Sequence, residues 1–255
     1  MRTPIVAGNW KMNKLMDEAV ELASAVAEGE SDLAGVEVVV GPTSACLAAV
    51  SDALGDSGVG LAAQNMHWAE SGAYTGELSA EMLLDAGCTH VILGHSERRE
   101  YFGETDEEVN HKTEVALDEG LVPIVCVGES LAERKAGRTV DKVSFQVRAA
   151  LAGLDVASVE KVVLAYEPLW AIGTGETATP KQAQEVHLAI RSLVGELYGE
   201  GAAESMRILY GGSVKPHNIS ELIQQPDLDG ALVGGASLDA GSFLSIARTA
   251  ATENA

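Results

Sequence analysis

The chain has 255 residues, 46% of them hydrophobic, so it can bury a large core. Its 38 acidic and 17 basic residues give a formal net charge of -21, which disfavours binding to nucleic acid or to an anionic membrane and is typical of a solvated acidic surface. Three scattered cysteines cannot form a disulfide framework and indicate a reducing compartment. No secretory leader pattern and no apolar run of membrane-spanning length occurs in the sequence, so we expect a cytoplasmic protein.

Short apolar runs alternate along the chain with segments of helical spacing. The runs are typical of strands buried on both faces: Ile5 to Ala7, Val36 to Val40, Val59 to Ala63, His90 to Leu93, Val122 to Val127, Val162 to Tyr166, Arg207 to Tyr210 and Ala231 to Val233. Helices are predicted at Asp17 to Ala27, Ser44 to Leu54, Ser79 to Ala86, Asp106 to Glu119, Val140 to Leu151, Pro180 to Leu197, Pro216 to Gln224 and Ser242 to Thr249.

Eight strand–helix units predict an α/β protein with parallel strands and helical crossovers. We expect them to close into a single (β/α)8 barrel domain over residues 1–255. An open, doubly wound sheet is the alternative. The glycine fingerprint of its dinucleotide-binding version, Gly-x-Gly-x-x-Gly between the first strand and the first helix, is missing from this sequence.

The first strand is followed by two polar side chains. On an extended chain, a period of two places Asn9 and Lys11 on the same face as Ile5 and Ala7, so both should point into the mouth of the barrel. Lys11 offers a local positive charge and Asn9 a directional amide in a protein whose overall field repels anions. A solvated lysine at a strand end is the alternative.

His95 lies just beyond the fourth run, before a charged stretch that is compatible with a helix. At a helix N-terminus, the positive end of the helix dipole disfavours protonation, so the imidazole would stay neutral and could donate a hydrogen bond to a carbonyl oxygen. Glu97 could pair with Lys11 and hold it in place. A structural histidine that caps a turn is the alternative.

Glu167 directly follows the apolar run Val162 to Tyr166. Active sites of α/β barrels are built at the carboxyl ends of the strands. Pro168 biases Glu167 toward extended geometry, and Gly173 and Gly175 permit a loop that closes over a substrate. We interpret Glu167 as a catalytic base beneath a lid, and the alternative is an ordinary glutamate at a strand end.

Two glycine pairs follow the last two strands. Gly211-Gly212-Ser213 comes after the seventh strand, and Gly234-Gly235 comes after the eighth. In barrels, the loops at these positions and an adjoining helix N-terminus often bind phosphate through backbone N–H groups. With Gly173 on the presumed lid, three loops could converge on one dianion.

Four motifs together resemble the triosephosphate isomerase family: Ala7 to Asn13, Gly94 to Arg99, Ala165 to Gly175 and Tyr210 to Val214. The resemblance extends along essentially the whole chain. It implies interconversion of dihydroxyacetone phosphate and D-glyceraldehyde 3-phosphate, in glycolysis and gluconeogenesis, without a metal or an organic cofactor.

The resemblance also implies a role for each site residue. Glu167 would move a proton between neighbouring carbons, neutral His95 would polarise the carbonyl, Lys11 would stabilise negative charge and Asn9 would orient the substrate. Phosphate would be held by Gly173, Ser213, Gly234 and Gly235.

The segment Gln64 to Glu77 resembles a loop that inserts into a second subunit beside the site. A homodimer is therefore implied, with Thr75 supporting Asn9 and Lys11 of the other subunit. The small phosphorylated triose is the other expected partner, and neither nucleic acid nor membrane is expected.

Two other functions compete with the isomerase. The first is another phosphosugar isomerase or an aldolase built on a barrel; an aldolase would need a lysine buried within a strand for a Schiff base, and the apolar runs contain none. A phosphate-binding barrel without catalysis would keep the glycine loops. It would require neither the base nor the electrophile, so the presence of both Glu167 and His95 argues against it.

Overall fold

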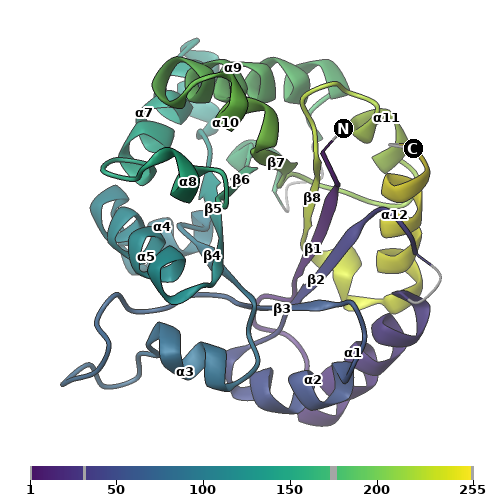
Figure 1. Cartoon of the computed structure of the whole chain (residues 1–255). Coiled ribbons are helices and arrows are strands. Elements are labelled where there is room, and N and C mark those ends of the chain that lie inside the picture. The colour runs from purple at the N-terminus through teal and green to yellow at the C-terminus, as the bar shows by residue number, and fades with distance from the viewer. Residues whose placement is uncertain (1, 31–32, 173–176, 254–255) are drawn as a thin grey trace.

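The computed structural model describes residues 2–30, 33–172 and 177–253. Within them, eight parallel strands form a closed barrel in which each strand pairs with its neighbours in chain order and β1 pairs with β8 (Figure 1). The strands are β1 (Ile5–Asn9), β2 (Glu37–Gly41), β3 (Gly60–Ala63), β4 (His90–Leu93), β5 (Val122–Val127), β6 (Val163–Tyr166), β7 (Arg207–Tyr210) and β8 (Gly230–Val233). The predicted (β/α)8 barrel is confirmed, and the open sheet is excluded.

Helices surround the barrel, and each repeat of the predicted alternation is present (Figure 1). They are α1 (Met16–Glu30), η1 (Ser44–Cys46), α2 (Leu47–Leu54), α3 (Ala80–Asp85), α4 (Ser96–Phe102), α5 (Asp106–Glu119), α6 (Leu131–Lys135), α7 (Thr139–Ala150), α8 (Val156–Val159), η2 (Leu169–Ala171), α9 (Pro180–Tyr198), α10 (Glu200–Ser205), α11 (Ile219–Ile223), η3 (Gly235–Leu238) and α12 (Ala240–Glu253). None of the described helices is long and apolar enough to cross a membrane.

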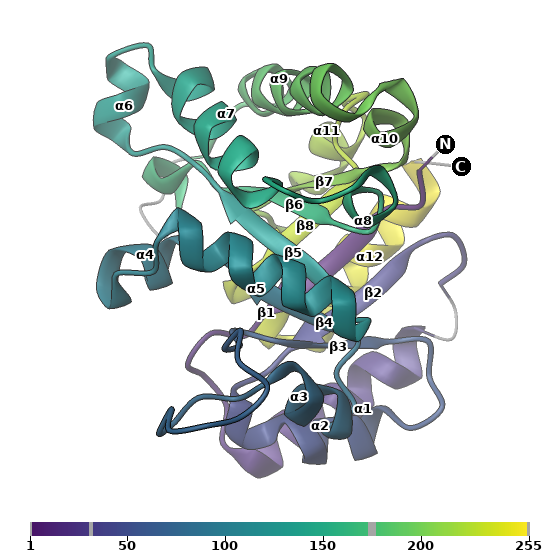
Figure 2. The ribbon, with the colours of Figure 1, turned by 60° about the vertical axis from the view of Figure 1, so that its left-hand side comes forward.

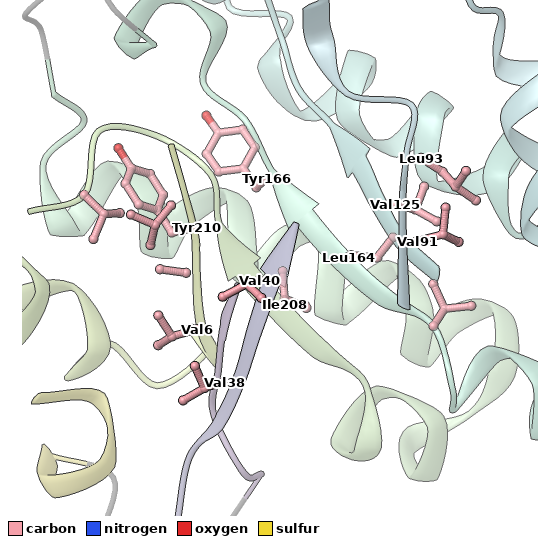
Figure 3. Close-up of a cluster of buried hydrophobic side chains, with 14 of the residues drawn as sticks. Val6, Val38, Val40, Val91, Leu93, Val125, Leu164, Tyr166, Ile208 and Tyr210 are labelled. Carbon is pink, nitrogen blue, oxygen red and sulfur yellow. The ribbon is translucent and has the colours of Figure 1, made fainter. Parts of the chain in front are cut away.

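The strands are continuous hydrophobic runs in the sequence because they contact two apolar layers, one inside the barrel and one between the barrel and the helices. Alternate strand residues fill the inside of the barrel, among them Ile5, Ala7, Val39, Ile92, Ile124, Val163, Ala165, Leu209 and Leu232. Their sequence neighbours point outward and pack against the helices, as the labelled side chains of β1, β2, β4, β5, β6 and β7 show in Figure 3. Because both faces of every strand are buried, the polar residues gather at the strand ends.

The amino end of the barrel, which we call the floor, contains a small charged cluster. Glu37 begins β2, and its carboxylate lies 2.7 Å from Nη1 of Arg207, which begins β7. The ring nitrogen Nε2 of His90, the first residue of β4, lies 3.0 Å from the other carboxylate oxygen. The His90 ring, and then the Arg207 guanidinium, hold the pKa of Glu37 below its ordinary value, although burial raises it.

The segment between β3 and α3 projects away from the barrel in both views (Figures 1 and 2). Aromatic contacts shape it: the His67 ring lies 4.2 Å from the Trp68 ring and 4.0 Å from the Tyr74 ring, measured between centroids. The backbone N–H of His67 also donates to the carbonyl of Leu78 (2.8 Å), which closes the base of the projection. This is the segment for which the family resemblance implies an intersubunit loop.

Candidate active site

A cavity of about 720 Å³ opens at the carboxyl end of the barrel. It is lined by residues at or beyond the ends of five different strands, and these include every predicted site residue that the structure describes: Asn9, Lys11, His95, Glu167, Ser213, Gly234 and Gly235. Gly173 and Gly175 lie outside the described residues. Parallel strands in a closed barrel bring all their carboxyl ends to one opening, so residues far apart in the sequence share this space.

Backbone contacts fix the position of Glu167, which directly follows β6 and is only 2% exposed. Its N–H donates to the carbonyl of Val127 (2.7 Å), which extends the ladder between β5 and β6 by one residue. A Cβ at Gly128 would lie 1.8 Å from the carbonyl oxygen of Glu167. Only glycine permits this approach, so the sequence of β5 and its loop helps to place the carboxylate on β6.

The carboxylate of Glu167 has polar partners at both oxygens. Ser96 donates its backbone N–H to Oε2 (2.9 Å) and its hydroxyl to Oε1 (3.1 Å), and Nε2 of His95 lies 3.0 Å from Oε1. Burial raises the pKa of Glu167, but His95 and Ser96 together more than offset this, so the pKa lies below its ordinary value. Glu167 is therefore ionised at neutral pH, as a base must be.

His95 is the N-cap of α4, as the sequence predicts. Its Nδ1 accepts the backbone N–H of Glu97 (3.3 Å), and this contact assigns the ring proton to Nε2 in the neutral tautomer. Burial lowers the pKa of His95, whereas the carboxylate of Glu167 raises it, and the net direction is upward, opposite to the shift predicted from the helix N-terminus. The two nearby charges on Lys11 and Glu97 pair with each other, so the proximity of Glu167 decides the direction of this shift.

Lys11 reaches the cavity by a different route from the predicted one. β1 ends at Asn9, and Lys11 has a φ of 53°, so the extended chain and its period of two do not continue to this residue. The prediction about the backbone was wrong, although the side chain does line the cavity. Nζ of Lys11 lies 2.6 Å from Oε1 of Glu97, which confirms the predicted pair. The side-chain oxygen of Asn9 accepts the N–H of Lys11 (3.0 Å).

The opposite side of the cavity is suited to an anion. Ser213 follows β7, and Gly234 and Gly235 follow β8. Because η3 begins at Gly235, the N–H of that residue has no acceptor within the helix and is available to a ligand. Lys11 and Lys215 also line the cavity, and they supply local positive charge in a chain with a net charge of -21.

Three further residues belong to the surroundings of this site. Ser96 holds the carboxylate of Glu167, Lys215 lines the cavity, and Gln64 binds the carbonyl of Lys11. The sequence could have indicated that Ser96 belongs to the site, because Ser96 follows His95 at the predicted start of a helix. Nothing in the local pattern distinguishes Gln64 or Lys215 from other polar residues that follow a strand.

The arrangement combines four chemical capabilities. An ionised carboxylate can accept a proton, an imidazole can donate a hydrogen bond to an oxygen, a lysine can stabilise developing negative charge, and backbone N–H groups can bind an anion. Glu167 and His95 come from different strands and meet at 3.0 Å in one buried site. Such a set can abstract a proton next to a carbonyl group in an anionic substrate.

Comparison with known proteins agrees with this chemistry. The sequence model of the family described as triosephosphate isomerase matches residues 4–250. A triosephosphate isomerase of Trichlorobacter lovleyi is 54% identical over 248 residues, which cover 97% of this chain and 99% of that protein. Those of Chloroflexus aurantiacus and Moorella thermoacetica are each 55% identical over 96% of this chain and 98% of the relative.

Proposed function

The chain belongs to the triosephosphate isomerase family and interconverts dihydroxyacetone phosphate and D-glyceraldehyde 3-phosphate, and we propose that Glu167, His95, Lys11 and Asn9 carry out this reaction. The observation that carries the proposal is the contact between the Glu167 carboxylate and the His95 ring, at 3.0 Å, inside a cavity that also contains Lys11 and Asn9. Binding a phosphate alone requires neither a buried base nor an adjacent electrophile.

Substrate binding begins with the phosphate. The N–H groups of Ser213, Gly234 and Gly235 bind its oxygens, and Gly173 contributes when the lid closes. The dianion is then fixed at the β7 and β8 side of the cavity, so the three-carbon chain extends toward β1, β4 and β6. Asn9 and Lys11 meet the substrate oxygens there, and the positive charge of Lys11 favours an anion over a neutral triose.

Proton transfer follows between two adjacent carbons. Glu167 exchanges its contacts with Ser96 for the substrate and removes a proton from the hydroxyl-bearing carbon C1 of dihydroxyacetone phosphate. The electron pair forms the C1–C2 double bond, and the carbonyl oxygen becomes the enediolate oxygen. His95 donates a hydrogen bond to that oxygen and transfers a proton between the two oxygens. Glu167 then returns its proton to C2, which gives the aldehyde.

The movement of Glu167 also controls the ionisation of His95. In the resting arrangement burial lowers the pKa of His95, but the adjacent carboxylate raises it by more. When Glu167 turns toward the substrate, this contact is lost, and burial together with the N–H of Glu97 at Nδ1 keeps the ring neutral. A neutral ring is the form predicted from the helix N-terminus.

We also propose a homodimer formed through the loop Gln64 to Glu77. Two large apolar side chains that are open to solvent, Met12 at 92% and Phe102 at 71% exposure, line one pocket together with Gln64 and Glu77 at the ends of this loop. Exposed apolar side chains beside the loop favour burial against a second copy. In this arrangement Thr75 from one subunit supports Asn9 and Lys11 of the other. A single domain and a cytoplasmic location stay predictions.

The first experiment measures isomerisation of D-glyceraldehyde 3-phosphate by purified protein, in a coupled assay with EDTA present. Rapid turnover by the wild type, and its loss in Glu167→Gln with retained binding of 2-phosphoglycolate, is the expected result. Equal turnover by the two proteins would refute the role of Glu167. A folded wild type that binds 2-phosphoglycolate without turnover would favour the phosphate-binding barrel instead.

A further inference from the structure

The charged groups of the cavity at the barrel mouth nearly cancel one another. Among its lining residues, Lys11 and Lys215 are cationic, and Glu97 and Glu167 are anionic. Lys11 pairs with Glu97 at 2.6 Å, so these two residues together present no net charge to an approaching ligand. With a neutral His95, the remaining charges are those of Glu167 and Lys215. Without Lys215, the cavity would therefore carry one net negative charge.

Lys215 can contribute to anion binding only through its side chain. Its backbone N–H donates to Oδ1 of Asn218 (2.8 Å), and its carbonyl oxygen accepts the N–H groups of Asn218 (3.1 Å) and Ile219 (3.2 Å). Both polar backbone groups are therefore used within the chain. The side chain is exposed, and no residue in the described part of the chain forms a salt bridge with it. Its ammonium group is the uncompensated positive charge of the cavity.

One turn holds Lys215 close to the proposed phosphate contacts. Nδ2 of Asn218 donates to the carbonyl of Ser213 (3.0 Å), while Oδ1 of the same side chain accepts the N–H of Lys215. Pro216 follows directly and biases Lys215 toward an extended backbone. The side chain of Asn218 thus fixes both ends of the segment from Ser213 to Lys215, and the charge is held on the β7 side of the cavity.

The charge of the whole protein makes this local charge important. A chain with a net charge of -21 repels anions at long range, and a phosphate monoester carries a charge of about -1.5 to -2 at pH 7. The fields of the paired Lys11 and Glu97 largely cancel at a distance, so Lys11 acts on a substrate mainly at contact. Lys215 has no such partner among the described residues, so its field reaches a substrate that is still outside the cavity.

We propose that Lys215 is a specificity-determining residue for the reaction: its unpaired ammonium group attracts the phosphate group of the substrate into the cavity and so favours anionic over neutral trioses. The inference rests on the proposed function, because it concerns how that substrate enters the same site. Attraction acts before the chemical step, so Lys215 raises kcat/KM through substrate association. Its effect becomes weaker as dissolved salt screens the charge.

The principal variant is Lys215→Met, which keeps most of the side chain and removes the charge. Lys161→Met is the matched control, because Lys161 is also exposed but precedes β6 and therefore lies at the floor of the barrel. Both substitutions make the net charge of the protein more negative by the same amount, but only Lys215 lines the cavity. Thermal unfolding at each ionic strength compares the stabilities of the variants with that of the wild type.

At an ionic strength of about 0.02 M, we expect Lys215→Met to lower kcat/KM for D-glyceraldehyde 3-phosphate about threefold and Lys215→Glu to lower it about tenfold, as for a dianion that passes roughly 10 Å from the charge. Both losses should nearly disappear at about 0.5 M. Lys161→Met should match the wild type at both ionic strengths. With neutral D-glyceraldehyde as the substrate, Lys215→Met and the wild type should have equal kcat/KM.

Three results would overturn the proposal: wild-type kinetics of Lys215→Met at low ionic strength, a loss that is independent of ionic strength or equal for D-glyceraldehyde, and an equal loss in Lys161→Met. Calorimetric binding of 2-phosphoglycolate gives a readout that needs no turnover, and Lys215→Met should weaken this binding at low ionic strength by a similar factor. A wild type that binds 2-phosphoglycolate without turnover would refute the proposed function, and the salt dependence of this binding would still test Lys215.

Discussion

The two ends of β4 carry the same pair of groups in different surroundings. At the floor, Nε2 of His90 lies 3.0 Å from Glu37, and at the mouth Nε2 of His95 lies 3.0 Å from Glu167. In both pairs the pKa of the carboxyl group is lowered.

The two carboxylates differ in the contacts that they make besides the histidine. Glu37 has the guanidinium of Arg207 at 2.7 Å, from the start of β7, a strand that does not pair with β2. Glu167 has the N–H and hydroxyl of Ser96 and borders an open cavity. The comparison indicates that a carboxylate–histidine pair can take part in catalysis where a substrate can replace the other hydrogen-bond partners of the carboxylate. The pair is structural where the carboxylate also binds a fixed cation.

The largest expected effect comes from removal of the charge at the mouth. Glu167→Gln should lower kcat by about 10³-fold, because the amide cannot accept a proton from carbon. Steady-state kinetics in both reaction directions measure the loss. The matched change at the floor, Glu37→Gln, should leave kcat within about twofold of wild type. A comparable loss of activity at the two ends would contradict the distinction between them.

Replacement of the histidine at the mouth should have the next largest effect. His95→Gln keeps a side-chain N–H donor but cannot move a proton between the substrate oxygens, so kcat should fall about 10²-fold. His90→Gln is the control at the other end of the same strand, and its kcat should match the wild type. Solvent-exchange measurements on the substrate would show whether the His95 variant still forms the enediolate.

The floor pair should affect stability and its dependence on pH. Glu37→Gln should lower the free energy of unfolding by about 1–2 kcal/mol at pH 7, because His90 and Arg207 lose a charged acceptor. Since the folded-state pKa of Glu37 lies below its ordinary value of 4.5, its stabilisation is present above that value and disappears as the pH falls through the folded-state pKa. Urea unfolding of both proteins from pH 7 to pH 3 should therefore show converging stabilities. A constant difference would show that the charge is not responsible.

The smallest expected effect concerns the resting position of the base. Ser96→Ala removes the hydroxyl donor to Glu167 but keeps the backbone N–H. One cause of the lowered pKa is lost, so the pKa of Glu167 should rise. Because catalysis requires the carboxylate, the acidic limb of the kcat/KM profile should move to higher pH, with only a few-fold change at its maximum. An unchanged acidic limb would argue against Ser96 as a determinant of this ionisation.

The strands and the strand-end residues were predictable because their signals are local. Continuous apolar runs identified all eight strands, and Asn9, His95 and Glu167 are found where the chain leaves β1, β4 and β6. Helices with long periodic faces were also predicted, as for α5, whose bounds match the prediction. Short helices such as α8 and α10 were not predicted, because four to six residues contain too little periodicity.

The parts that were not predictable depend on contacts between distant residues. The φ of Lys11 departs from the strand pattern because Asn9 and Gln64 together hold its backbone, and Gln64 lies 53 positions away. Ser96 follows His95 in sequence, but its role as the partner of Glu167 exists only when β4 and β6 share one opening. Single-sequence patterns indicate which side chains reach the mouth of the barrel, and tertiary contacts determine how each is held there.

The pairing of β1 with β8 also has a consequence for biosynthesis. Ile5 lies beside Gly230 in the closed ladder, and its N–H donates to the carbonyl of Asp229 (2.9 Å). At roughly 5–20 residues per second, a ribosome needs about 10–45 s to add the residues between them. During that time the edge of β1 that faces β8 has no native partner, and the pairing of β1 with β2 covers only the opposite edge. The nascent chain therefore depends on chaperones to avoid intermolecular strand addition before the barrel closes.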